Sequence, residues 1–582
     1  MIKAKIAHGV ATAFVGFVVA AAPLGVCAET ALAPVQLAPV VAEHGMVATQ
    51  EKQATRIGVE ILRRGGNAVD AAVAVGLALA VTLPDAGNLG GGGFMLVHLA
   101  KTTKASAKTI AIDYRETAPA DTPRTVFLDK SGQAVPAKSR DTGLGVGVPS
   151  TVAGFAYALK HYGSGKFTLA DLARPAIVLA RKGFIVDEDL AARLAQAAPR
   201  LAHWPSSAKI FLHEDGTPFR RGERLVQSDL AASLESLAHD GARSFYTGPT
   251  AAKIVAAVQA AGGHMTRQDM QDYQAKPRVP VQGTYRGYDI VAMPPPSSGG
   301  VALIELLNIL EGYPLAKYGA ESPEALHLMA EAMKPVYADR AQYLGDPDRV
   351  KVPVHGLTSM AYATKLRAAI SLTKARPAAE IRAGNPLPYE SRETTHFSVV
   401  DSQGNAVSNT YTLNFGFGIG LVAPGTGILL NNELDDFAAK PGAPNAYGLL
   451  GGAANAPAGG KRPLSSMTPT MVFDKGKLIL VTGSPGGSRI ITIVAQIVLD
   501  CLDFHMNVAK AEAAPRIHDQ WMPDELQIEP GFPPATLQKL VAMGHHLHEF
   551  SPWGSAQSIM RHGNGWEGGS DPRQHDGLAA GY

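Results

Sequence analysis

The most informative segment of the chain is Thr394-Thr395-His396-Phe397-Ser398-Val399-Val400-Asp401-Ser402-Gln403-Gly404-Asn405-Ala406-Val407-Ser408-Asn409-Thr410-Tyr411-Thr412-Leu413-Asn414. A turn cluster at residues 401–405 separates two β-rich runs, which predicts a hairpin. With the turn centred on Gln403, Thr394 lies opposite Thr412, and Asn414 follows on the same face. Ordinary surface threonines are the alternative interpretation, and a one-residue slip in register would scatter the cluster.

The segment before the hairpin, residues 373–393, has a different composition. It is rich in proline and mixed charges and has no apolar period, which predicts a loose loop. A threonine that begins a strand after such a loop becomes a chain N-terminus if the Glu393–Thr394 bond is cut. Its free α-amine, with an ordinary pKa of about 7.7–8.0, is then a base beside its own hydroxyl. The pattern therefore suggests a nucleophile that needs no histidine or aspartate partner.

Composition limits the function classes. Of the 582 residues, 46% are hydrophobic and 18% charged, which is typical of a globular chain of several domains. Lys and Arg total 53 against 51 for Asp and Glu, a net charge of +2 that argues against a nucleic-acid partner. Two cysteines cannot form a disulfide framework or a Cys-rich zinc site.

The first 28 residues are expected to be a signal peptide. Lys3 and Lys5 precede an apolar run at residues 10–22, and Val26-Cys27-Ala28 is typical of a cleavage site. An N-terminal membrane anchor is the alternative. No later stretch reaches about 18 strongly apolar residues, so we expect no stable membrane span after signal removal. The expected location is periplasmic or secreted, without dependence on disulfides.

The chain before Thr394 is predicted to be rich in helices, and the chain after it to be rich in strands. The apolar run from Asn67 to Leu83 predicts a buried helix. Three further helices are expected to begin at Ser150, at Thr168 with Asp171 as a capping box, and at Ser322-Pro323.

Several motifs in order resemble the γ-glutamyltranspeptidases (glutathione hydrolases), which are N-terminal-nucleophile hydrolases made as one precursor that cleaves itself into two subunits. Besides the hairpin, the similar segments are Gly87–Phe94, Asp113–Pro119, Asn431–Phe437, Arg462–Thr470, Gly483–Arg489, Ser570–Arg573 and the end of the chain through Tyr582. The resemblance implies a four-layer αββα sandwich of class α+β. It also implies a signal peptide at 1–28, a large subunit at 29–393 and a small subunit at 394–582, which together form one αββα unit.

The resemblance also implies a role for each site residue. The expected catalytic groups are the nucleophile Thr394, the assisting Thr412, and the N–H groups of Gly486 and Gly487 as oxyanion hole. The expected binding groups are Arg115, Ser465 and Ser466 for the donor's α-carboxylate; Asn414, Glu433 and Asp436 for its α-ammonium; and Tyr447 as a lid.

The chemistry of these residue types agrees with the roles. Arginine offers a rigid fork that suits a carboxylate, two acids suit an ammonium, and glycines let N–H groups approach a developing oxyanion. Simpler interpretations exist for each group. Arg115 can pair with Glu116, the acids can form a solvated turn, and Gly486-Gly487 and Ser465-Ser466 can be plain turns.

The expected function is transfer of a γ-glutamyl group from glutathione and other γ-glutamyl compounds to water, amino acids or peptides, without cofactor or metal. One alternative is an acylase of the same architecture that acts on glutaryl side chains of β-lactam precursors. A second alternative is a non-catalytic exported protein that binds γ-glutamyl compounds. An ammonium pocket distinguishes the first alternative, and self-cleavage distinguishes the second.

Overall fold

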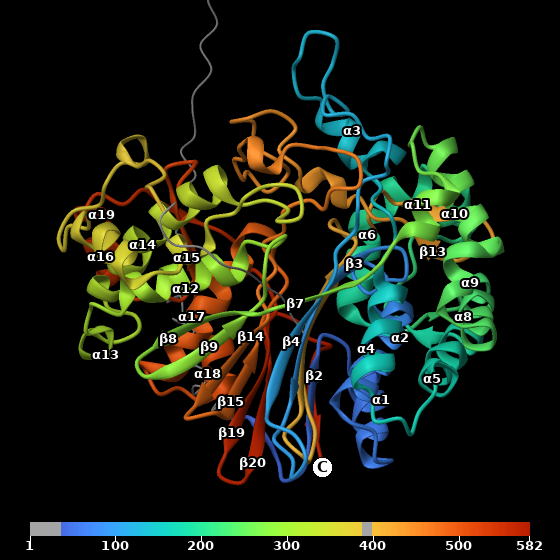
Figure 1. Cartoon of the computed structure of the whole chain (residues 1–582), viewed down its shortest axis with the longest axis horizontal. Helices are drawn as coiled ribbons and strands as arrows, with labels where there is room; N and C mark the ends of the chain where they lie inside the picture. Colours follow the sequence, from blue (N-terminus) through green and yellow to red (C-terminus); the bar gives the residue numbers. More distant parts are fainter. Residues whose placement is uncertain (1–36, 387–397) are drawn as a thin grey trace, which may run out of the picture. The chain divides into compact units, whose positions relative to one another are not determined.

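Two antiparallel sheets of seven strands lie face to face in this computed structural model, which describes residues 37–386 and 398–582. Helices cover the outer face of each sheet, so the layers run helix, sheet, sheet, helix (Figure 1). The predicted αββα class is therefore confirmed. No helix of the described ranges is long and apolar enough to cross a membrane.

Each sheet contains strands from both of the described ranges, that is, from before residue 387 and from after residue 397. The first sheet has the order β1 (Val40–Ala42), β20 (Gly565–Ser570), β19 (Gln557–His562), β15 (Lys477–Thr482), β14 (Thr470–Asp474), β9 (Tyr288–Ala292), β8 (Val281–Tyr285). The second has the order β21 (Leu578–Gly581), β2 (Met46–Thr49), β10 (Ser398–Val400), β11 (Ala406–Thr412), β3 (Gly92–Leu99), β4 (Lys108–Tyr114), β7 (Lys276–Arg278). The two parts of the chain are thus interleaved.

The helices form two groups. Those on the side of the first sheet include α12 (Gly299–Leu310), α13 (Leu315–Tyr318), α14 (Pro323–Tyr343), α15 (Val354–Leu357), α16 (Met360–Ala368), α17 (Ile490–Leu502), α18 (Val508–Ala513) and α19 (Pro534–Ala542). Those on the side of the second sheet include α1 (Lys52–Arg63), α2 (Ala68–Thr82), α4 (Thr151–Tyr162), α5 (Leu169–Lys182), α6 (Glu188–Ala202), α8 (Ser228–Asp240), α9 (Ala242–Thr247), α10 (Pro249–Ala260) and α11 (Arg267–Asp272).

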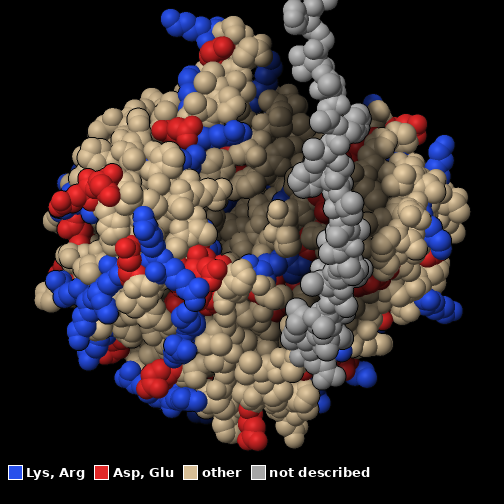
Figure 2. All heavy atoms as spheres, turned by 180° about the vertical axis from the view of Figure 1, so that it is seen from behind, with Lys and Arg blue, Asp and Glu red and all other residues tan. Residues whose placement is uncertain are grey.

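Shorter elements connect these layers. They are the helices α3 (Pro136–Arg140) and α7 (Pro205–Phe211) and the strands β5 (Phe184–Ile185), β6 (Arg224–Leu225), β12 (Val422–Ala423), β13 (Ile428–Leu429), β16 (Ile517–His518), β17 (Leu526–Ile528) and β18 (Leu547–Glu549). Figure 2 shows basic and acidic side chains interspersed on one face, which fits the nearly balanced charge of the sequence.

Helix starts largely follow the predictions. Asn67 and Asp70 form a capping box at α2, whose residues are all buried, and Thr168 and Asp171 form another at α5. Helix α4 begins at Thr151 as expected, but Ser150 does not cap it. The Ser150 hydroxyl instead donates to the Tyr114 carbonyl at 2.6 Å, which ties α4 to β4.

The hairpin has the predicted register. Ser398 lies opposite Ser408, Val399 opposite Val407 and Val400 opposite Ala406, and the pair is inserted between β2 and β3. Thr394 lies outside the described residues, so its position opposite Thr412 stays a prediction.

The second sheet is buried on both faces. Along β2, Met46 and Ala48 face the core shared with the first sheet, whereas Val47 faces the core under α1 and α2. Along β3, Phe94 and Met95 alternate in the same way. These strands are apolar throughout because both faces are covered.

A strap at residues 371–386 crosses helix α14 and is held by a row of that helix's polar side chains. The bonds are His327 Nε2 to Ser371 O (2.7 Å), Arg376 N to Glu331 (3.1 Å), Lys334 Nζ to Arg376 O (2.8 Å), Gly384 N to Asp339 (2.7 Å) and Tyr343 OH to Gly384 O (2.6 Å). The expectation of a loose loop is therefore wrong as far as Pro386, which is buried. The remainder of that loop lies outside the described residues.

Candidate active site

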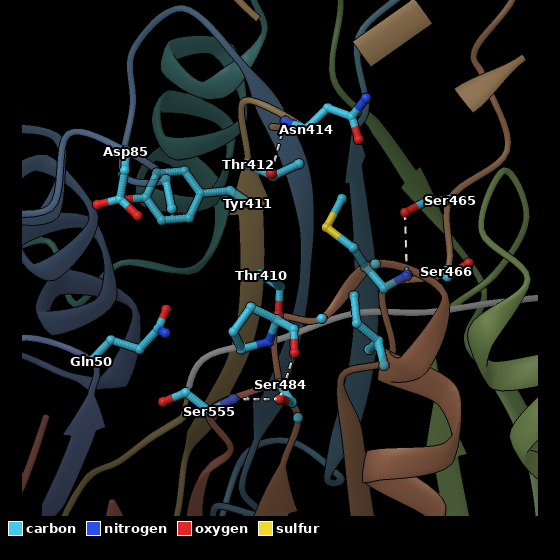
Figure 3. A pocket seen from close by; sticks show the side chains of 18 of the residues that line it. Gln50, Asp85, Thr410, Tyr411, Thr412, Asn414, Ser465, Ser466, Ser484 and Ser555 are labelled. Carbon is cyan, nitrogen blue, oxygen red and sulfur yellow. Dashed lines mark hydrogen bonds between the residues drawn. The ribbon is translucent and has the colours of Figure 1, made fainter. Parts of the chain in front are cut away.

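A cavity opens where β11 ends (Figure 3). Its walls combine the end of β11, the turn before α17 and the loops around residues 433–447 and 465–467. The predicted site residues on these walls are Thr412, Asn414, Glu433, Asp436, Tyr447, Ser465, Ser466, Gly486 and Gly487. Glu393 and Thr394 lie outside the described residues. The structure thus brings together predicted groups that are far apart in the sequence.

Thr412 and Asn414 form the floor at the strand end. The backbone N–H of Asn414 donates to the Thr412 hydroxyl at 2.8 Å, so this hydroxyl has a fixed position. Asn414 has φ of 73°, a left-handed conformation that asparagine tolerates better than most residues. Its side-chain amide donates to the Asn432 carbonyl at 3.0 Å, which holds the strand end against the acidic segment that follows.

Tyr447 covers one side of the cavity. Its hydroxyl donates to the side-chain oxygen of Asn414 at 2.8 Å, and its ring lies over Gly487. A Cβ atom at Gly487 would lie 2.5 Å from Tyr447 Cδ1, so only glycine leaves room for the ring. This arrangement is compatible with the predicted lid.

Gly486 and Gly487 precede helix α17. Their φ angles are 146° and 58°, both in the region that favours glycine. None of the acceptors in the described residues takes a hydrogen bond from either N–H group. The pair therefore presents two free donors beside the cavity, close to the positive end of the α17 dipole.

Arg115 lies behind the acids rather than on the cavity wall. It is fully buried, and its guanidinium bonds Glu433 and the Asp436 carboxylate, the latter at 2.6 Å. Its Nε donates to the Pro463 carbonyl at 3.1 Å, and a carboxylate oxygen of Glu116 lies 4.0 Å from the terminal nitrogen that bonds Glu433. The acids predicted to bind an ammonium are therefore the ion partners of the arginine predicted to bind the carboxylate.

Burial controls the charge of this cluster. It raises the pKa of Glu433 to about 7 even though Arg115 opposes the shift, and it also raises the pKa of Asp436. Burial and the neighbouring Glu433 raise the pKa of Glu116 as well. Burial alone would lower the pKa of Arg115, but the surrounding carboxylates raise it, so the guanidinium stays charged. An added cation is the natural partner for this excess of acids.

Sequence reasoning missed two buried charges near the cavity. Both carboxylate oxygens of Glu116 lack a hydrogen-bond partner among the described residues. Arg340 on α14 donates to the Ser466 hydroxyl at 2.9 Å. The sequence suggests Glu116 only as an ion partner for Arg115. No local signal sets Arg340 apart, because α14 carries Glu331, Lys334 and Asp339 as well.

Two stacked antiparallel sheets between helical layers, with a cavity at the end of the strand pair that follows the expected cleavage point, define an N-terminal-nucleophile hydrolase. Residues 54–581 match the sequence model of the family described as gamma-glutamyltranspeptidase. The chain therefore belongs to the γ-glutamyltranspeptidase family.

Known proteins of two kinds are similar to this chain. It is 52% identical to the glutathione hydrolase proenzyme of Escherichia coli (strain K12), over 94% of this chain and 93% of that protein. It is 37% identical to the acylase ACY 1 proenzyme of Pseudomonas sp. (strain V22), over 88% of each chain. The crystal structure of a cephalosporin acylase from Bacillus halodurans superposes with a TM-score of 0.83 at 29% identity, covering 95% of this chain and 98% of that one.

Proposed function

We propose that this chain is the proenzyme of an exported γ-glutamyltranspeptidase, or glutathione hydrolase. It takes the γ-glutamyl group from glutathione and related amides and passes it to water, amino acids or peptides. The observation that carries the proposal is the cavity at the end of β11, where the Thr412 hydroxyl, two glycine N–H groups that have no acceptor among the described residues, and an acid pair meet. Family membership and the glutathione hydrolase relatives support the same activity.

Maturation comes first in this proposal. The Thr394 hydroxyl attacks the carbonyl carbon of Glu393, the peptide C–N bond breaks, and an ester forms while the nitrogen takes up the proton. Water then hydrolyses the ester, which leaves a carboxylate on Glu393 and a free amine on Thr394. The large fragment 29–393 and the small fragment 394–582 result, after removal of the signal peptide 1–28 during export to the periplasm or medium.

Catalysis reuses the same hydroxyl. Thr394 Oγ attacks the γ-carbonyl carbon of the donor while the Thr394 amine accepts the hydroxyl proton. Gly486 and Gly487 stabilise the oxyanion, an effect of about 3–4 kcal/mol per donor in comparable sites. The amine of the leaving group takes the proton and departs. Water, or the amine of an acceptor, then attacks the γ-glutamyl ester and restores the free hydroxyl.

The donor's zwitterion complements the charged cluster. Ser465 and Ser466 offer hydroxyl groups to the α-carboxylate, with Arg115 behind the cavity wall as a further positive charge. Asn414, Glu433 and Asp436 offer oxygen acceptors to the α-ammonium. Tyr447 closes over the bound group.

A substitution at the nucleophile tests the proposal. Thr394→Ala removes the attacking hydroxyl of both proposed reactions, so we expect one band on a denaturing gel and no detectable release of p-nitroaniline from γ-glutamyl-p-nitroanilide. Thr395→Ala is the matched control and should give two bands and retain activity. N-terminal sequencing of wild-type protein should find a chain that begins at Thr394. Cleavage or turnover in Thr394→Ala would refute the mechanism.

The acylase alternative has its own support from the acylase relatives. A glutaryl donor carries a carboxylate but no ammonium, so it gains nothing from Glu433 and Asp436. We therefore expect kcat/KM for γ-glutamyl-p-nitroanilide to exceed that for glutaryl-p-nitroanilide by more than tenfold. The reverse order would favour the acylase.

A further inference from the structure

Arg340 is a buried arginine whose side-chain hydrogen bonds go to hydroxyl groups. It lies on α14 with 5% of its surface exposed. Its Nε donates to the Ser298 hydroxyl at 2.8 Å, and its terminal nitrogen donates to the Ser466 hydroxyl at 2.9 Å. Within the described ranges, no carboxylate oxygen lies within 4.0 Å of its nitrogens, since it takes part in no ion pair.

Other buried arginines of this chain are neutralised locally. Arg115 has Glu433 and Asp436 as partners, and Arg516 bonds Asp571 at 2.5 Å. A buried charge without an ionic partner is costly, because water no longer solvates it. The burial of Arg340 accordingly lowers its pKa. Among the described acids, Asp436 on the cavity wall opposes this shift from a distance but makes no ion pair with Arg340, so an anion that enters the cavity would add the close negative charge.

The hydrogen-bond directions link Arg340 to that cavity. A guanidinium can only donate, so its bond to Ser466 occupies a lone pair of the hydroxyl oxygen and leaves the O–H free. No acceptor among the described residues takes this hydroxyl proton, and Ser466 lines the cavity (Figure 3). The positive charge therefore polarises a hydroxyl that is free to donate to a ligand.

The contact between Arg340 and Ser298 holds the backbone of Ser465 in place. The Ser298 hydroxyl accepts from Arg340 and donates to the Ser465 carbonyl at 2.6 Å. The Ser298 N–H donates to the same carbonyl at 2.8 Å. Arg340 thus holds the side chain of Ser466 directly and the backbone of Ser465 through one hydroxyl.

We propose that Arg340 is a positioning residue that makes the Ser465–Ser466 wall selective for a donor carrying an α-carboxylate, by orienting and polarising the Ser466 hydroxyl. This inference rests on the proposed function. Arg340 does not touch the donor. It supplies the positive charge, whereas Ser466 makes the hydrogen bond. Arg115, saturated by acids in this structure, is a separate source of charge.

A pair of donors that differ only in this carboxylate tests the inference. The probes are γ-glutamyl-p-nitroanilide and 4-aminobutyryl-p-nitroanilide, which retains the amine and lacks the carboxylate. In Arg340→Gln, KM for the first donor should rise about tenfold to a hundredfold, the range for a charge-assisted hydrogen bond. Its kcat should change by less than about threefold, and kcat/KM for the second donor should stay the same.

Companion variants separate positioning from folding. Arg340→Lys keeps the charge but loses the fork, so KM for the γ-glutamyl donor should be intermediate. Ser466→Ala should match Arg340→Gln, and the double variant should be no worse than either single one, because both changes remove one interaction. Lys334→Gln is the matched control: it removes a buried cation of the same helix that is paired with Glu331, so it should lower Tm without changing donor selectivity.

A binding measurement covers the case in which Arg340→Gln fails to fold. The shift in Tm produced by glutamate, compared with that produced by 4-aminobutyrate, should be larger in wild type and reduced in Arg340→Lys and Ser466→Ala. Three results would overturn the inference: an equal loss of kcat/KM with both donors, an unchanged KM for the γ-glutamyl donor in Arg340→Gln, or additive increases in that KM in the double variant. A wild-type protein that is inactive on both donors would instead overturn the proposed function.

Discussion

At the scale of the residue, Glu433 shows how burial and function are coupled. Its carboxylate is buried and paired with Arg115, yet its pKa lies near 7 because desolvation and the neighbouring acids outweigh the arginine. An acid whose pKa is raised on folding stabilises the protein below its ordinary pKa of about 4.3. That contribution is lost as the pH rises through about 7. A bound ammonium group would stabilise the ionised Glu433 carboxylate and so offset this loss of stability.

The pH dependence of donor binding follows from this coupling. Below about pH 7, Glu433 of the free enzyme is protonated and attracts an ammonium less, so KM should rise by up to about tenfold per pH unit. Glu433→Gln should remove this rise when KM for γ-glutamyl-p-nitroanilide is measured from pH 5.5 to 8.5. Asp435→Asn, which changes an acid bonded to Ser139, should keep it. A rise that persists in Glu433→Gln would assign the titration to another group.

Residue roles could be predicted only where a motif surrounds them. The glycine pair, the serine pair and the acids of segment 431–437 were found in this way, and the structure places them on one cavity. The position of Arg115 behind Glu433 and Asp436 was not predicted, nor was the contact between Arg340 and Ser466. These contacts join segments that are distant in sequence, so no local pattern encodes them.

At the scale of the element, the turn before α17 and the loop of Tyr447 depend on each other. Gly487 has a left-handed φ of 58° and supports the Tyr447 ring at a distance that leaves no room for a Cβ atom. The ring is held from its other end by Asn414. Moving either element would therefore disturb both the N–H donors and the cover of the cavity.

An added methyl group should reveal this dependence. We expect Gly487→Ala to lower kcat/KM at least tenfold, because the methyl group displaces Tyr447 and strains the turn. The loss should be smaller in a Tyr447→Ala background, where the clash is absent. Gly563→Ala is the control, since Gly563 has φ of 57° and nothing within 4 Å of the added atom. Equal losses in both backgrounds would assign the effect to backbone strain alone.

Elements with local signals were predicted well, and the strap was not. Helices α2 and α5 could be predicted from their capping residues and apolar content, because these signals lie within or next to the helix in the sequence. The strap at 371–386 has neither, because its backbone groups are satisfied by side chains of α14. Proline-rich composition therefore indicated irregular structure correctly, but residues 373–386 are attached to α14 rather than loose.

At the scale of the whole molecule, the two expected fragments share both sheets. Strands β10 and β11 lie between β2 and β3, and β9 pairs with β14, so separation would break backbone ladders in each sheet. It would also open the apolar cores on both sides of the second sheet. The sequence predicted this layering through the family resemblance, whereas periodicity alone supported only helices followed by strands.

Interleaving predicts that cleavage does not separate the fragments. The processed protein should elute as one species in gel filtration, also at 1 M salt, because the interface is mainly apolar and salt screens only charges. It should unfold in a single transition and separate into two chains only in denaturant. Uncleaved Thr394→Ala provides the control for elution volume. Dissociation under native conditions would contradict the prediction.

If the chain is cut after Glu393, the strap on α14 would anchor the new carboxyl-terminal end of the large fragment. Because Gly384 and Pro386 are fixed, a break after Glu393 would leave a tail of residues 387–393 on the large fragment. A fully extended chain of that length spans about 25 Å at most. A carboxyl terminus produced by the proposed cut would therefore stay within that radius of its anchor, and the strength of the anchor would decide how far it could withdraw from the proposed nucleophile.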